Sequence, residues 1–439
     1  MATIAQITEA MQAVFGNKVD ELARESGFIQ REVVVNGIGF VKSMVMAFQG
    51  DKAASYSEIS ACACSVGMPI TSQGIEQRFC RCSSQFMKAV LEHALAVKVK
   101  GVDEQSVPLL QRFKAVHIRD SSVISLPEAL KDTWKGVGGS QGETASLKVQ
   151  VCWDQRSGSL DGITLQDGYC QDRTSPYQNM ELSAGELHIG DLGYFSLEKL
   201  AADHQKGVFW LTRLKFKTLV WDEQEIALDL LAFLAKQTQT QLDIPVYVGQ
   251  NKQVFCRLLA SRVPQEVADQ RRQRIKESYR KKGRQPSEKL LQLADWTLVL
   301  TNVPQDKLSL QEALVLLKIR WQIELLFKLW KSYLSIDQWT SQNRWRILTE
   351  IYAKLLIAVL FHWTMLVDFW KYPDRSMFKA YKVFQYYAFL ILQSIENQEL
   401  LTSILKHLST CYTKSCHISR HSKNSCTFQV LLNPEATLC

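Results

Sequence analysis

The chain has 439 residues, of which 46% are hydrophobic and 22% charged, with 52 Lys and Arg residues against 44 Asp and Glu residues. This length predicts two to four domains, and the composition excludes a wholly disordered chain. The net charge of +8 favours a polyanionic partner without identifying one. Because no basic start followed by an apolar run opens the chain, we expect its eleven cysteines to be free thiols in a cytoplasmic setting.

Two further patterns argue against a membrane and against a zinc site. The longest apolar run, residues 355–367, falls short of the roughly 20 residues that a membrane span needs, so we expect a buried helix and no membrane partner. The tail holds several possible zinc ligands, in an order that matches no familiar zinc pattern. These are Cys411, Cys416, His417, His421 and Cys426.

Residues 1–105 are expected to form a helical DNA-binding domain, since apolar residues recur at helical spacing. Within it, residues 57–80 predict two short helices around a turn at Gly67 and Pro69, with Ser57 capping the first and Thr71 or Ser72 the second. This pattern indicates a helix-turn-helix whose second helix enters a major groove. An ordinary helical hairpin is the alternative.

From about residue 112 the pattern changes to alternating strands, and strand-helix units follow, which predicts an α/β core. Strands are expected at 113–119, 147–153, 158–165, 187–190 and 208–214, with a helix at 195–204. We expect a first core segment at 106–214, a β-rich insertion at 215–303, a core segment with a long helix at 304–345, C-terminal helices at 346–408 and a loose tail at 409–439.

The insertion contains a strongly basic segment, residues 271–284, with eight Lys or Arg residues and one acid, Glu277. A charge run of this kind is usually a solvated face. In a DNA enzyme it would instead lie along phosphates. The cations are Arg271, Arg272, Arg274, Lys276, Arg280, Lys281, Lys282 and Arg284.

Three acidic residues are candidates for chemistry. Asp120 follows the expected strand 113–119, and Asp191 follows the strand 187–190, which are the positions where open α/β sheets place their sites. A single Asp at a strand end is often only a turn residue. Glu324 lies in the expected helix 308–334.

The surroundings of Glu324 are more informative. Arg320, Glu324 and Lys331 are spaced by four and seven residues, so on one continuous helix they share a face, among bulky apolar neighbours such as Trp321. Such a polar stripe on a buried helix is either an ion-pair network or a site in which a metal ion and phosphates supply the missing partners.

Five segments resemble the DDE transposases of insertion-sequence family four. The run from Leu317 to Lys331 resembles the family's Y-(2)-R-(3)-E-(6)-K signature through Arg320, Glu324 and Lys331, with Leu317 at the Tyr position. Residues 117–122 and 189–196 resemble the segments around the first and second Asp. Residues 295–301 resemble the strand with a base-stacking Trp, here Trp296, and residues 209–213 the strand with a DNA-contacting Arg, here Arg213.

The resemblance implies an α/β fold with a ribonuclease H-like catalytic core and a β-rich insertion, preceded by an all-helical domain and followed by C-terminal helices. It implies two Mg²⁺ ions, replaceable by Mn²⁺, held by Asp120, Asp191 and Glu324. Carboxylates suit this role because Mg²⁺ prefers hard oxygen ligands, and paired metals promote in-line displacement at phosphorus.

The resemblance also implies cut-and-paste transposition through hairpin ends. Trp296 would stack on a flipped base, while Arg320 and Lys331 would hold phosphates. The expected partners are transposon-end DNA, target DNA and a second copy of the chain in a synaptic dimer, through the C-terminal helices.

Leu317 departs from the pattern because it lacks the phenolic hydroxyl of the family's Tyr. This keeps a second hypothesis open, a degenerate copy that binds DNA and cuts slowly. A third hypothesis, of another class, is a helix-turn-helix regulator without cleavage activity.

Overall fold

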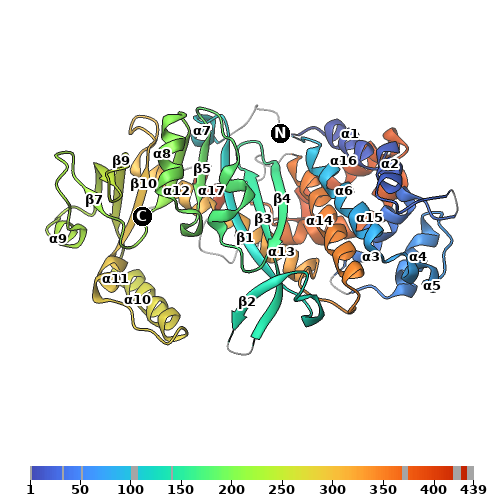
Figure 1. Cartoon of the computed structure of the whole chain (residues 1–439). Coiled ribbons are helices and arrows are strands. Elements are labelled where there is room, and N and C mark those ends of the chain that lie inside the picture. The colour runs from blue at the N-terminus through green and yellow to red at the C-terminus, as the bar shows by residue number, and fades with distance from the viewer. Residues whose placement is uncertain are drawn as a thin grey trace. The chain divides into compact units, whose positions relative to one another are not determined.

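The computed structural model describes residues 2–31, 34–50, 53–99, 107–139, 142–367, 374–418 and 427–432 (Figure 1). It consists of two compact units, each made of separate stretches of the chain. The first unit comprises Met1–Val107, Ser121–Cys170 and Trp321–Gln429, and the second comprises Pro108–Asp120, Gln171–Arg320 and Val430–Cys439. Each unit therefore combines stretches from several of the predicted domains, and the domain boundaries stay a prediction.

The first unit begins with the predicted helical region. Thr3 caps the first helix with Gln6 as its reciprocal partner, and Ser55 with Glu58 does the same for the fourth. Ser55 rather than the predicted Ser57 is therefore the cap. The helices are α1 (Ile4–Val14), α2 (Asn17–Glu25), α3 (Gly37–Phe48), α4 (Tyr56–Ser65), α5 (Ser72–Arg78) and α6 (Arg81–Ala96).

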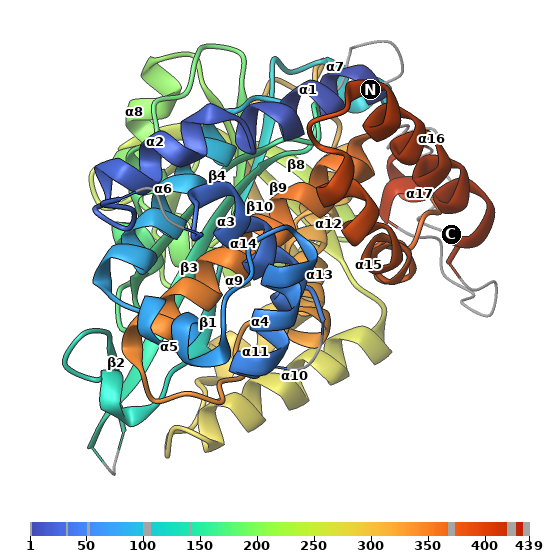
Figure 2. The same ribbon diagram turned by 90° about the vertical axis from the view of Figure 1, so that its right-hand side faces the viewer.

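The C-terminal helices of this unit are α13 (Trp321–Tyr333), α14 (Arg344–Leu366), α15 (Met377–Ser394) and α16 (Gln398–Ser415). Helix α17 (Thr427–Leu432) begins in the first unit, and its residues from Val430 on belong to the second. Helix α14 packs against α6 and α3, and α15 lies beside α16 (Figures 1 and 2). By length and composition α14 could cross a membrane, but its apolar 18-residue window is wholly buried, as expected of a core helix. Helix α16 and α17 include residues that were predicted to form a loose tail.

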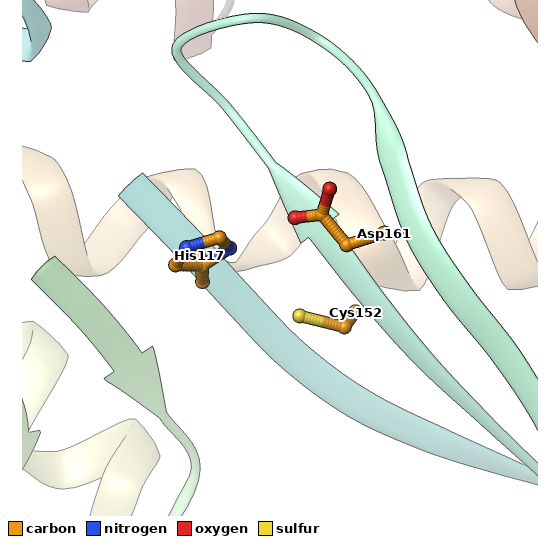
Figure 3. Close-up of side chains that lie close together, drawn as sticks. All are labelled: His117, Cys152 and Asp161. Carbon is orange, nitrogen blue, oxygen red and sulfur yellow. The ribbon is translucent and has the colours of Figure 1, made fainter. Parts of the chain in front are cut away.

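The first unit also holds the strands β2 (Lys135–Gly139), β3 (Gly142–Asp154) and β4 (Leu160–Asp167). β3 and β4 cover the two strands expected at 147–153 and 158–165 and pair as an antiparallel hairpin, and Gly158 in its turn has a φ of 78°. The register slips after Cys152, so that Asp161 is left between paired positions. Figure 3 shows Cys152 and Asp161 on their two strands and His117 on β1 (Val116–Ser125).

The sheet of the second unit has the strand order β1-β5-β6-β10-β9-β8-β7. Its strands after β1 are β5 (Leu187–Gly190), β6 (Phe209–Arg213), β7 (Val220–Trp221), β8 (Gln241–Val248), β9 (Val254–Arg262) and β10 (Trp296–Thr301). β1, β5 and β6 are parallel, whereas β10 and the insertion strands are antiparallel. The predicted α/β class is confirmed, since the described residues form an N-terminal helical region, a mixed β-sheet with helices, and C-terminal helices. The ribonuclease H-like assignment of the core stays a prediction.

Helices complete the second unit. They are α7 (Pro108–Gln111), α8 (Leu197–Gln205), α9 (Leu230–Ala235), α10 (Gln265–Arg280), α11 (Glu288–Gln292) and α12 (Leu310–Ile319). Trp210 on β6 and Leu200 on α8 are buried in one apolar cluster with residues of β8 and β9 such as Val246 and Leu258. The insertion strands and the core strands thus share this apolar cluster.

Two predicted elements differ from the structure. The expected helix 308–334 is two helices, because the chain leaves α12 at Arg320 and α13 begins at Trp321. The strand expected to end at Arg119 continues, as β1, to Ser125, so Asp120 lies within the strand and not just beyond it. Asp120 is the last residue of β1 that belongs to the second unit.

Two buried histidines, one in each unit, predict a loss of stability in acid. Burial lowers the pKa of His188 and of His362 to about 4, against an ordinary value of 6.5. Since the unfolded chain binds these protons first, the free energy of unfolding should fall as the pH drops from 6.5 towards 4, by about 1 kcal/mol per unit for each histidine. Urea unfolding at several pH values tests this, and His362→Gln, which can still donate to the Gly158 carbonyl, should reduce the slope.

Candidate functional site

Asp120 lies on β1, and Asp191 directly follows the neighbouring parallel strand β5. Ile118 pairs with Ile189, and Arg119 pairs with Gly190, so the next residue on each chain segment is one of the two aspartates. Side chains alternate along a strand, and therefore both carboxylates lie on the face that Ile118 and Ile189 occupy. Neighbouring strands are about 4.8 Å apart. Both aspartates are partly buried, which makes this a paired-carboxylate site.

Arg320 binds one member of the pair. Its Nη1 donates to Oδ2 of Asp120 over 2.7 Å, and both side chains are largely buried, with exposed fractions of 20% and 17%. A largely buried carboxylate needs such a partner, since an unpaired buried charge is costly. Sequence reasoning expected Arg320 to hold a phosphate, whereas in this structure it is bound to Asp120. It can serve a phosphate only if it leaves or shares this carboxylate.

Within the second unit, the structure thus brings together Asp120, Asp191 and Arg320. Glu324 and Lys331 belong to the first unit. Glu324 is partly buried in the first turn of α13, four residues after Arg320. Lys331, in the last turn of α13, donates from Nζ to the carbonyl oxygen of Val123 on β1 over 3.0 Å.

Trp321 is a candidate that sequence reasoning missed. It was counted among the buried apolar residues of the helix, but it is 54% exposed. The signal was present in the spacing: Trp321, Glu324, Lys328 and Lys331 are separated by three, four and three residues, which puts all four on one face of α13. An exposed indole next to Arg320 in the chain offers a stacking surface.

The second unit also contains a cavity of about 650 Å³ that gathers four of the predicted DNA-binding residues. Arg213, Arg271, Arg274 and Trp296 line it, with further cations and with apolar side chains from α9, α10, α11 and β10. Burial and, secondarily, the charge of Arg213 lower the pKa of Arg271. This volume is in the range of ligand pockets, and its excess of cations favours an anionic ligand.

Trp296 is part of the core in this structure. It is only 7% exposed and packs with Leu234, Leu242 and Ala260. The guanidinium of Arg262 lies 5.1 Å from the centre of its ring. A base could stack on Trp296 only after Arg262 and other neighbours move, so its expected stacking role stays a prediction.

Two predicted phosphate ligands of the basic segment are instead bound to protein groups. Arg271 donates to the carbonyl oxygen of Trp296 over 3.2 Å and to Oγ1 of Thr297 over 3.0 Å. Arg272 forms ion pairs with Asp269 and Asp295. Both side chains therefore fasten α10 to the start of β10.

The remaining predicted cations of this segment are better placed for a polyanion. Arg274 is exposed at the cavity, and Lys281, Lys282 and Arg284 are exposed after the end of α10. Flexible, solvated cations of this kind contact phosphates without reading sequence.

The predicted helix-turn-helix corresponds to α4 and α5. They pack together around Gly67, which has a φ of 83°, and Thr71 caps α5 as expected. Only Ile75 of α5 is buried, which leaves Gln73 and Gln77 exposed. The arrangement fits a recognition helix, and DNA contact there stays a prediction.

Comparisons of the sequence with known protein families and proteins agree on one family. Residues 111–360 match the family described as Transposase DDE domain. The chain is 28% identical to the transposase for insertion sequence element IS231F of Bacillus thuringiensis subsp. israelensis, over 97% of this chain and 94% of that protein. It is 24% identical to the transposase for IS1151 of Clostridium perfringens, over 94% and 93%. Among solved structures, the piggyBac transposase synaptic complex with hairpin DNA gives a TM-score of 0.48 at 9% identity, covering 95% of this chain and 87% of that one.

Proposed function

The chain belongs to the DDE-domain transposases and is therefore an enzyme of DNA transposition, and we propose that it cuts and joins DNA strands through divalent metal ions held by Asp120, Asp191 and Glu324. The observation that carries this proposal is the register of β1 and β5, which aligns the two aspartates on one face. Paired carboxylate oxygens are the donor set that Mg²⁺ prefers, so the residues fit the group. Two Mg²⁺ ions, replaceable by Mn²⁺, would stabilise the attacking and leaving oxygens of an in-line displacement.

The proposed sequence of strand cleavage runs through hairpin ends. Water attacks the phosphodiester at the end of the element and frees a 3′-OH. This 3′-OH attacks the opposite strand, which closes a hairpin and releases the flanking DNA. Water then reopens the hairpin, and the 3′-OH joins target DNA. Support for these steps is the Arg320, Glu324 and Lys331 spacing, which resembles the signature of hairpin-forming relatives.

Binding of the DNA backbone is assigned to the exposed cations. Arg213, Arg274, Lys281, Lys282 and Arg284 would contact phosphates, and Arg320 would join them on release from Asp120. Recognition of the element's end is assigned to residues 1–105, and synapsis to a second copy of the chain through the C-terminal helices, in the bacterial cytoplasm.

Hairpin formation requires a base to leave the duplex, and two tryptophans, Trp321 and Trp296, are candidates for stacking on that base. We expect Trp321→Ala to slow hairpin formation by about 10-fold or more, because stacking on an aromatic ring stabilises an unstacked base by roughly 1–3 kcal/mol. Trp321 offers the more exposed ring, and Trp296→Ala should mainly lower the melting temperature because it opens a cavity in the core. Fluorescence of 2-aminopurine at the terminal bases measures unstacking. Loss of unstacking in Trp296→Ala alone would reverse this assignment.

The experiment that tests the proposed function is cleavage of a labelled duplex carrying the element's own end, with Mg²⁺ or Mn²⁺. Metal-dependent nicking by the wild type, lost in Asp191→Asn, supports it. DNA binding without cleavage by the wild type indicates a degenerate copy, which Leu317 would explain, and restoring cleavage with Leu317→Tyr would support that alternative. Sequence-specific binding with no metal dependence at all indicates a regulator.

A further inference from the structure

Arg119 is a buried cation on the side of β1 opposite to Asp120. Its side chain is 1% exposed, and it pairs with Gly190 of β5 in the sheet. Side chains alternate along a strand, so Arg119, His188 and Gly190 share one face, while Asp120 and Asp191 share the other.

Two nitrogen atoms of this guanidinium, Nε and Nη2, are buried and have no hydrogen-bond partner among the residues that the structure describes. The polar groups around it are already engaged. His188 Nε2 bonds Oδ2 of Asp203 over 2.9 Å, and Lys199 pairs with the other oxygen of the same carboxylate over 2.9 Å. A buried donor without an acceptor is strongly unfavourable, so this guanidinium needs a partner that the neighbouring side chains do not supply.

A small cavity lies at this point, with a volume of about 20 Å³. Besides Arg119 and His188, it is lined by Gln178, Gly190, Asp191, Tyr194 and Ser196. Roughly 10–15 Å³ is enough for one water molecule, provided that two to four polar partners surround it. A phosphate or any larger anion would not fit. The side chain of Gln178 already contacts the segment after Asp191, because its Nε2 donates to the carbonyl oxygen of Tyr194 over 3.1 Å.

We propose that this cavity holds one structural water, which accepts from Nε and Nη2 of Arg119 and donates to the segment 190–196 that carries Asp191. Arg119 is then a positioning residue: through the water, it fixes the backbone from which the Asp191 carboxylate projects. One water can make all of these hydrogen bonds. Its two lone pairs accept from the two guanidinium donors, and its two O–H groups remain free to donate to acceptors in the segment. This inference rests on the proposed role of Asp191 as a metal ligand.

Three variants distinguish the role of the water from the role of the Arg119 charge. Gly190→Ala adds a methyl group to the cavity wall, 3.4 Å from Cβ of Tyr194, which is an ordinary contact. It should displace the water while keeping Arg119. Arg119→Met removes the donors, and Arg119→Lys keeps the charge. Mutation of a residue that supports a metal ligand typically lowers metal affinity or activity by about 10–100-fold. We therefore expect Gly190→Ala and Arg119→Met to raise the Mn²⁺ concentration for half-maximal cleavage by about 10-fold or more, and Arg119→Lys to recover part of this.

Melting temperature and affinity for end DNA are measured in parallel, so that a general loss of folding is recognised. A high-resolution crystal structure should show one water in the cavity of the wild type and none in Gly190→Ala. The inference is overturned if the wild type cleaves DNA but the variants keep its Mn²⁺ requirement, or if the cavity of the wild type contains no water. If the wild type does not cleave, the proposed function fails, while the crystal structure still decides whether the water is present.

Discussion

Replacing Glu324 with Gln is expected to reduce metal-dependent DNA cleavage by more than about 100-fold, with DNA binding and folding retained. Residues that merely support metal ligands typically contribute about 10–100-fold, so loss of a ligand's charge should exceed this range. The amide is nearly the same size as the carboxylate, and Glu324 lies only partly buried in the first turn of α13, so the helix should tolerate the change. The measurement is cleavage of labelled end DNA at increasing Mn²⁺ concentration.

The matched control is Glu198→Gln, which removes an exposed carboxylate from the first turn of α8. It should leave both cleavage and DNA binding close to wild type. If Glu324→Gln cleaves as well as this control, the third carboxylate of the site has been assigned to the wrong residue. Asp120 and Asp191 would keep their support from the strand register in that case.

The sequence predicted the position of Asp191 more accurately than that of Asp120. The run 187–190 is short, apolar and followed by Asp-Leu-Gly, and the structure has β5 at Leu187–Gly190. β1 was predicted to end at Arg119, because Asp120, Ser121 and Ser122 interrupt its apolar pattern. A strand with a partly exposed end gives no clean alternation, so its continuation to Ser125 depends on tertiary pairing that local pattern does not contain.

Charge patterns predicted a basic segment but could not separate structural cations from free ones. Arg271 and Arg272 bind groups near the start of β10, about 25 residues further along the chain, whereas Lys281 and Lys282 remain exposed. The break between α12 and α13 at Arg320 could not be predicted either, because no Gly or Pro lies there in the sequence. That break determines where Arg320 lies, and its ion pair with Asp120 is a contact between residues 200 positions apart.

A second large effect is expected in the core of the first unit, where Lys354 and Glu350 form an ion pair on α14. Their Nζ and Oε1 are 2.7 Å apart, and the side chains are 0% and 2% exposed. Lys354 also donates to the carbonyl oxygen of Ser335 over 2.9 Å. Lys354→Met should lower the free energy of unfolding by roughly 3–5 kcal/mol, because it leaves the Glu350 carboxylate buried without its cation.

The double variant Glu350→Leu with Lys354→Met shows whether the ion pair itself stabilises the fold. The alternative is that the single variant loses stability only because it leaves one buried charge without its partner. Apolar replacements of a buried pair are often neutral or better, so the double variant should recover most of the loss despite leaving the Ser335 carbonyl without its donor. Urea denaturation of both variants measures this, with Lys88→Met as control, since the Lys88–Glu92 pair is more than half exposed and should contribute less than about 1 kcal/mol. If the double variant is no more stable than Lys354→Met, the stabilising contribution of Lys354 comes from its hydrogen bond to the Ser335 carbonyl and not from the ion pair.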